Sequence, residues 1–130
     1  METDGEWSLE QVEGADWGDP PPEARPVVAR VHRLRRKPIG QLTDNDLRVL
    51  VAQRVGLAAL LPRVLDRLAE NPLVEADFFP GDLLTVVLRV PAEHWRAHPD
   101  QHARIERIIT SVADPDPELT DEITAFRART

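Results

Sequence analysis

Three histidines have the spacing of a metal site. His94, His98 and His102 follow one another at intervals of four residues, which places them on one face if a single helix carries all three. Imidazoles arranged in this way hold Zn²⁺ together with a nearby carboxylate. Pro99 interrupts such a helix, however, and the chain has no cysteine and no His-Glu-x-x-His motif. We therefore expect scattered surface histidines, no metal site and no cofactor.

Two carboxylates beside aromatic residues form a second candidate site. Asp77 and Asp82 flank Phe78 and Phe79, and a pair of acids across a cleft is the arrangement that hydrolyses glycosidic bonds. A helical chain of 130 residues offers little room for the deep cleft that this chemistry needs. The alternative is that Asp82 caps a helix next to a solvated turn, with both phenylalanines in the core. We expect this alternative and no enzymatic activity.

The most basic stretch covers residues 30–37. Arg30, Arg33 and Lys37 share one face of a predicted helix, and such a row of cations also suits phosphate groups. The acidic N-terminal segment cancels this positive field or packs on it. We therefore expect no binding to nucleic acid.

Negative charge is concentrated at the N-terminus of a chain whose formal net charge is −7. Residues 1–24 contain no base and eight acids, which are Glu2, Asp4, Glu6, Glu10, Glu13, Asp16, Asp19 and Glu23. Trp7 and Trp17 lie among these acids, and tryptophan is frequent at the energetic centres of interfaces. Such an arm suits a basic protein partner. The alternatives are a solvated tail or an arm that packs on its own domain.

These residues are positioned by short helices. Ser8 and Gln11 have the spacing of a capping box, and Gly14 follows, so a helix is predicted over residues 8–13. Apolar periodicity, caps and N-terminal prolines predict further helices over 27–36, after Thr43, over 57–68, after Pro99 and after Asp116, with one more turn over 92–97.

Residues 83–90 are ambiguous between a strand and a buried helix. Their β-branched side chains favour a strand. The rest of the chain offers no second strand, and an unpaired strand leaves its backbone groups without partners. We therefore predict a helix.

The predicted fold is an all-α, single-domain bundle of five to seven short helices. Residues 1–24 form the acidic arm packed on the domain, and residues 25–130 form the helical domain. The strongest apolar stripes predict a core made of Leu47, Leu50, Leu57, Leu61, Leu65, Leu68, Ile105 and Ile109. The longest apolar stretch, residues 55–61, is shorter than the roughly 20 residues of a membrane span. We expect no membrane association, a cytoplasmic location and a monomer.

Several short motifs follow one another in a characteristic order between residues 8 and 95. They include SLEQVEG at 8–14, LTDNDLR at 42–48, NPL at 71–73 and DFFPGDLL at 77–84. Together they resemble the small helical immunity proteins of bacterial contact-dependent growth inhibition (CDI) systems. Phe79 stands where that family often has a tyrosine. The resemblance implies a cytoplasmic protein without catalysis, which binds and neutralises the C-terminal toxin domain, often a nuclease, of a cognate effector.

The resemblance leaves the toxin-binding residues open, and charge guides the expectation. Nuclease toxins are commonly basic around the substrate groove, so acids on an inhibitor match that surface. We expect the toxin to contact the arm at Glu6, Trp7, Glu10, Glu13, Asp16 and Trp17. If the arm instead packs on Arg30, Arg33 and Arg36, Asp77 and Asp82 are the second choice. The alternative function is a helical adaptor or regulator that binds another basic protein.

Overall fold

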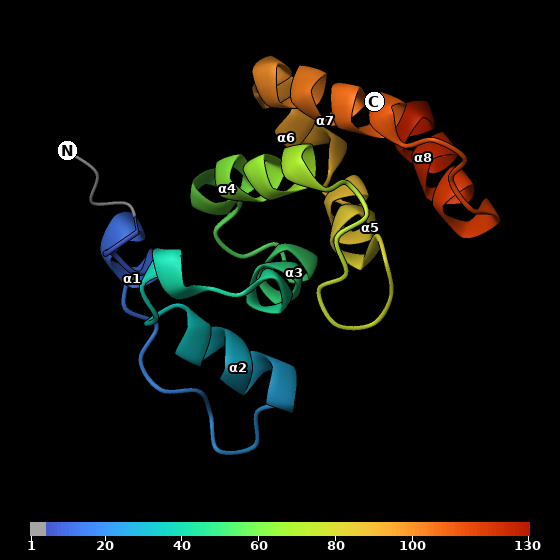
Figure 1. Cartoon of the computed structure of the whole chain (residues 1–130). Helices are drawn as coiled ribbons and strands as arrows, with labels where there is room; N and C mark the ends of the chain where they lie inside the picture. The colour runs from blue at the N-terminus through green and yellow to red at the C-terminus, as the bar shows by residue number, and fades with distance from the viewer. Residues whose placement is uncertain (1–4) are drawn as a thin grey trace.

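The computed structural model describes residues 5–130 and contains eight α-helices in this range (Figure 1). They are α1 (Leu9–Glu13), α2 (Pro26–Leu34), α3 (Asp44–Ala52), α4 (Leu57–Glu70), α5 (Asp82–Leu88), α6 (Ala92–Ala97), α7 (Pro99–Ser111) and α8 (Pro117–Arg129), with a 3₁₀ turn, η1 (Ile39–Gln41). The all-α class is confirmed. The predicted number of five to seven helices is too low, because the turn expected over 92–97 is the separate helix α6. Glu2 and Asp4 of the acidic arm lie outside the described residues.

Side-chain capping interactions determine where three of these helices, α1, α3 and α8, begin. Ser8 and Gln11 form the predicted capping box of α1, and Thr43 forms an equivalent box with Asp46 at α3. Asp116 caps α8 by accepting the N–H of Leu119 at 2.8 Å. α1 ends at Gly14, whose φ of 65° is the left-handed conformation that glycine adopts without strain.

The predicted helix over residues 83–90 is confirmed for residues 83–88, whereas Arg89 and Val90 lie beyond its C-terminal end. α5 begins after Gly81, whose φ is 89°, so Asp82 is the first residue of the helix and not its cap. The apolar side chains of Leu83, Leu84 and Val87 are fully buried. As a helix, a short apolar segment forms its backbone hydrogen bonds internally and buries side chains on several sides. A single strand without a partner strand leaves its backbone groups unpaired.

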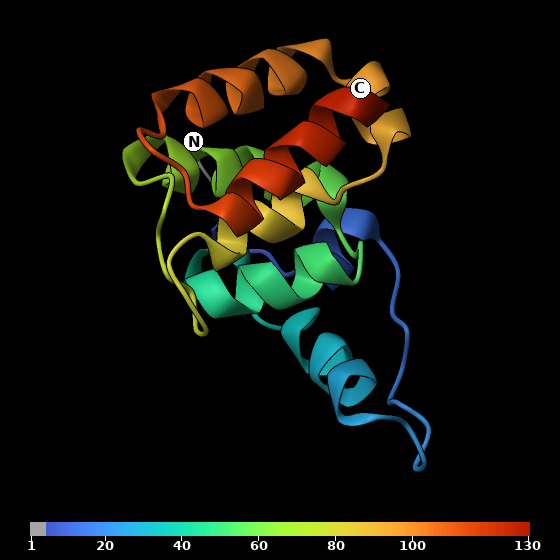
Figure 2. The ribbon, with the colours of Figure 1, turned by 90° about the vertical axis from the view of Figure 1, so that its right-hand side faces the viewer.

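The core lies between α3, α4, α5 and the C-terminal helices. Seven of the eight predicted core residues are buried, and Leu57, in the first turn of α4, is partly buried. α4 runs without interruption through Pro62. Figure 2 shows α7 and α8 at one end of the molecule, with α2 and the proline-rich loop before it at the other end. None of the helices within residues 5–130 has the length and apolar character that crossing a membrane requires.

Candidate functional site

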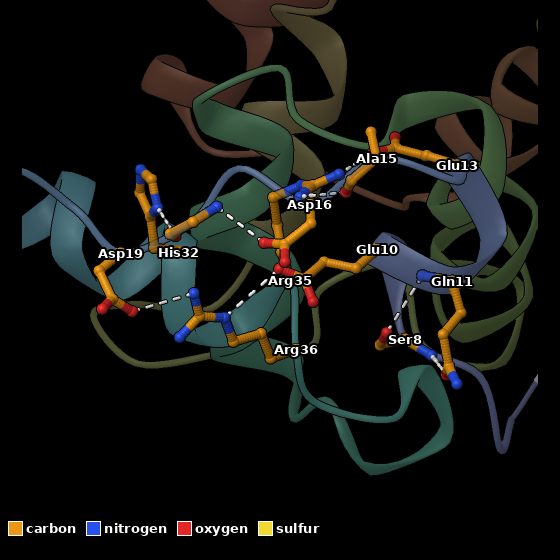
Figure 3. A network of polar contacts seen from close by, with 11 residues as sticks. Ser8, Glu10, Gln11, Glu13, Ala15, Asp16, Asp19, His32, Arg35 and Arg36 are labelled. Carbon is orange, nitrogen blue, oxygen red and sulfur yellow. Dashed lines mark hydrogen bonds and ion pairs between the residues drawn. The ribbon is translucent and has the colours of Figure 1, made fainter.

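The acidic arm is held on α2 by a buried arginine (Figure 3). The side chain of Arg35 is fully buried, and its guanidinium forms an ion pair with the carboxylate of Glu13. It also donates to the carbonyl oxygen of Ala15 at 3.1 Å and lies 4.0 Å from the centre of the Trp17 ring. One cation thus fixes the end of α1 and the segment that follows it.

Arg36 forms a second clamp at the surface. Its guanidinium donates to Glu10 at 3.3 Å and to Asp19 at 3.1 Å, and these bonds, that to Asp19 first, raise its pKa. The ring of His32 hydrogen-bonds the carbonyl oxygen of Gly18 at 3.0 Å. The arm is therefore fastened to α2 at both ends of the segment between Glu10 and Asp19 (Figure 3).

Backbone hydrogen bonds and an apolar anchor fix the first part of the arm. The carbonyl oxygen of Trp7 accepts the N–H of Ile39 at 2.8 Å, and the N–H of Glu10 donates to the carbonyl oxygen of Arg35 at 3.1 Å. The side chain of Leu9 is fully buried, and a β-carbon built on Gly56 lies 2.8 Å from it. Leu9 therefore packs directly against the turn before α4.

The structure separates the arm residues that sequence analysis grouped together. Glu10 and Glu13 form ion pairs within the chain, so their first effect is to hold the arm. Arg36 is the one of the three expected arginines that holds the arm among the described residues. Arg35, which the sequence did not single out, holds it as well. Arg30 instead pairs with Asp46 of α3 at 3.1 Å. Arg35 was missed because a charged side chain in the most basic stretch gives no sequence signal of burial.

The outer face of the arm remains open. Trp7 is 46% exposed, Trp17 47% and Val12 45%, which is high for apolar side chains. Glu6 and Asp16, which directly precede Trp7 and Trp17 in the chain, are exposed as well. The backbone N–H of Gly18 donates to the carboxylate of Asp16 at 2.7 Å and lowers its pKa, so this carboxylate stays charged. Aromatic side chains that are exposed in the free chain are enriched at protein interfaces.

Asp77 and Asp82 do not form a pair of free carboxylates. Asp82 is buried and accepts the N–H groups of Ala76, Asp77 and Phe78 at 2.7, 3.0 and 2.9 Å. Burial acts to raise the pKa of Asp82, but these backbone bonds outweigh it and the pKa is lowered. Its carboxylate orders the loop before α5, whereas the side chain of Asp77 is exposed.

The expectation that Phe78 and Phe79 belong to the core is wrong. Their side chains are 66% and 46% exposed. Three backbone groups of the loop are tied to Asp82, and Glu75 forms an isolated bridge with Pro80, so the loop closes on itself and leaves both rings outside. An apolar dipeptide before a Pro-Gly turn does not reveal from sequence which side of the loop it occupies.

The histidines pack against aromatic side chains. As predicted, the helix is interrupted, since α6 ends at Ala97 and α7 begins at Pro99. The rings of His94 and His98 stack with centres 4.2 Å apart, and the ring of His102 lies 5.8 Å from that of Phe126. All three are half-buried, so the expectation of scattered surface histidines is wrong. Across residues 5–130, no group of three or more His, Cys, Asp or Glu side chains is placed to hold a metal ion.

These features define a class of protein. An all-α fold that presents exposed tryptophans on an arm held by ion pairs and hydrogen bonds has the features of a protein-binding module. The family model of the CDI immunity proteins matches residues 11–105, and the chain belongs to that family. No curated protein and no solved structure matches the chain significantly.

Proposed function

We propose that this chain binds and neutralises the C-terminal toxin domain of a cognate CDI effector through the outer face of its arm. This arm surface consists of Glu6, Trp7, Val12, Asp16 and Trp17. The observation that carries the proposal is the exposure of two tryptophans on a segment fixed by a fully buried arginine. Membership of the CDI immunity family supports a toxin domain as the partner.

The rigid attachment of the arm favours tight binding. An interface segment that is ordered before binding loses less conformational entropy when the complex forms. The ion pairs of Glu10 and Glu13 with Arg36 and Arg35 provide this order. In the proposal these two acids therefore position the arm surface, and the tryptophan rings fill pockets on the toxin.

The charges of the arm surface set the rate of encounter. Glu6 and Asp16 are exposed, and a nuclease toxin presents cations around the groove that holds its phosphate substrate. Opposite charges on the two surfaces speed association and block access of the substrate. Asp77 is the exposed acid of a second surface, and Asp82 keeps the loop of that surface in shape.

The proposed function requires a single copy of the chain and no catalysis by it. It operates in the cytoplasm, where an imported toxin meets its substrate. The proposal covers nuclease and non-nuclease toxins alike, because the inhibitor acts by occupying a surface.

A growth experiment tests the proposed function. The toxin domain encoded beside this chain is expressed from an inducible promoter, with and without the chain. We expect the chain to restore growth and the Trp7→Ala, Trp17→Ala double variant to restore less growth at equal protein level. A matched variant, Phe79→Ala, removes an aromatic side chain of similar exposure from another surface and should protect fully. Failure of the unaltered chain to protect against its neighbouring toxin overturns the proposal.

A further inference from the structure

A groove between α2 and α3 differs in charge from the rest of the molecule. Its volume is about 490 Å³. Apolar side chains of both helices form much of its wall, and Arg30, Arg33 and Arg48 line it together with the ring of Phe78. The lining residues include three arginines and no acid. A positive groove is thus present on a chain whose net charge is −7.

The positive charge of the groove is incompletely neutralised. Arg33 is exposed, and within residues 5–130 it forms no ion pair or side-chain hydrogen bond. Arg30 shares the carboxylate of Asp46 with Lys37, at 3.1 and 3.0 Å, so one acid faces two cations. Arg48 donates to the neutral amide of Asn45 at 2.8 Å. An anion entering the groove therefore meets guanidinium groups with free donors.

Phe78 adds an apolar contact to this groove. It is the most exposed of the large apolar side chains among the described residues, at 66%. The guanidinium of Arg48 lies 4.5 Å from the centre of the Phe78 ring. The backbone N–H of Phe78 donates to the carboxylate of Asp82, which fixes the position of the residue. A stacked guanidinium keeps its edge available for a carboxylate while its face covers the ring.

We propose that this groove binds an acidic segment of a partner protein. Carboxylates of the segment pair with Arg33 and Arg48, and an apolar side chain of the segment lies between Phe78 and the apolar wall. A protein segment fits better than nucleic acid, because the net charge of −7 repels a long polyanion and the wall of the groove is apolar. The groove is separate from the arm surface, which is held by His32 of α2 and by Arg35 after its end and carries the opposite charge.

The test uses the full chain and a fluorescent peptide of about eight residues, made of glutamates around one central phenylalanine. We expect saturable binding by fluorescence anisotropy that weakens as salt is added. Arg33→Glu should weaken binding about tenfold, since it removes one charge-assisted contact and introduces a repulsion. Phe78→Ala should weaken binding of this peptide more than binding of an all-glutamate peptide. Arg107→Glu on α7 is the matched control, because Arg107 is exposed and lies outside the groove.

Several results overturn the inference. One is the absence of saturable peptide binding, and another is equal binding by the unaltered chain and Arg33→Glu with circular dichroism unchanged. Preferential binding of an oligouridine RNA in place of the peptide assigns the groove to nucleic acid. A dimer in sedimentation that Arg33→Glu dissociates assigns it to a second copy of the chain. The test contains no toxin, so failure of the proposed arm surface leaves its result unaffected.

Discussion

Replacing Arg35 with methionine tests whether one buried cation holds the arm. Methionine keeps most of the length of the arginine stem and removes the guanidinium. The substitution deletes the ion pair with Glu13, the bond to the carbonyl oxygen of Ala15 and the contact with the Trp17 ring. The backbone hydrogen bond between Arg35 and Glu10 remains, because it involves main-chain atoms.

The free energy that Arg35→Met removes from the attachment of the arm depends on how exposed the remaining partner groups are. Breaking a fully buried ion pair costs about 3–5 kcal/mol, because the remaining charge stays buried and unpaired. Here the side chain of Glu13 is 35% exposed, so water solvates its carboxylate once the guanidinium is gone. The Nε atom of Arg35 has no partner, and removing it relieves a desolvation cost. We therefore expect a loss of about 1–2 kcal/mol in the attachment of the arm.

Limited proteolysis after glutamate measures this attachment. Glu13 is the last residue of α1, and its cleavage requires that the arm leaves α2. A loss of about 1–2 kcal/mol raises the population of the released arm, and the cleavage rate, about five- to thirtyfold. Arg33→Met is the matched control, because Arg33 lies two residues earlier in the last turn of α2, and it should leave the rate unchanged. Equal cleavage of Arg35→Met and the unaltered chain, with both folded by circular dichroism, refutes the role given to Arg35.

Three further changes test the core, the loop before α5 and the charges of the arm surface. Leu65→Ala should destabilise the fold by about 2–5 kcal/mol, because its side chain is fully buried; an unchanged thermal midpoint contradicts this core assignment. Asp82→Asn should cost about 2 kcal/mol at pH 7. Since folding lowers the pKa of Asp82 below 3.8, its stabilisation is present above that pH and disappears as pH falls through the folded-state pKa. Urea unfolding should therefore show the two proteins converging in acid, and a constant difference contradicts this role. Glu6→Gln with Asp16→Asn should slow toxin association and reduce its salt dependence in stopped-flow measurements, while the asparagine keeps the bond to Gly18; an unaltered rate at low salt shows that these charges do not guide encounter.

Local signals in the sequence were sufficient for much of the fold. The capping boxes at Ser8 and Thr43 and the prolines at the starts of α7 and α8 act within a few residues, so their effects follow from spacing alone. The helix α5 was predicted from the lack of a partner strand, although its residue types favour a strand. Tertiary context here overrides local propensity.

The site depends on contacts between distant residues, which the sequence does not specify. Arg35 and Glu13 lie 22 residues apart, and nothing in the basic stretch distinguishes the buried Arg35 from the exposed Arg36. Asp82 has the residue type of a helix cap, yet it is the first helical residue of α5, and its carboxylate accepts N–H groups of the loop before the helix. The groove between α2 and α3 forms only when two helices and a loop pack together. The sequence therefore shows the row of Arg30 and Arg33 but does not predict that these side chains line a groove.

The affinity of the chain for its neighbouring toxin domain, compared between Trp7→Ala and Phe79→Ala, tests the central claim most directly. Both side chains are 46% exposed, and they belong to different surfaces. If the arm surface binds the toxin, titration calorimetry should show a loss of about 2 kcal/mol or more for Trp7→Ala, which is roughly thirtyfold in Kd, and little change for Phe79→Ala. Unchanged affinity of Trp7→Ala together with weakened binding by Phe79→Ala contradicts the account and moves the toxin to the surface around the loop before α5.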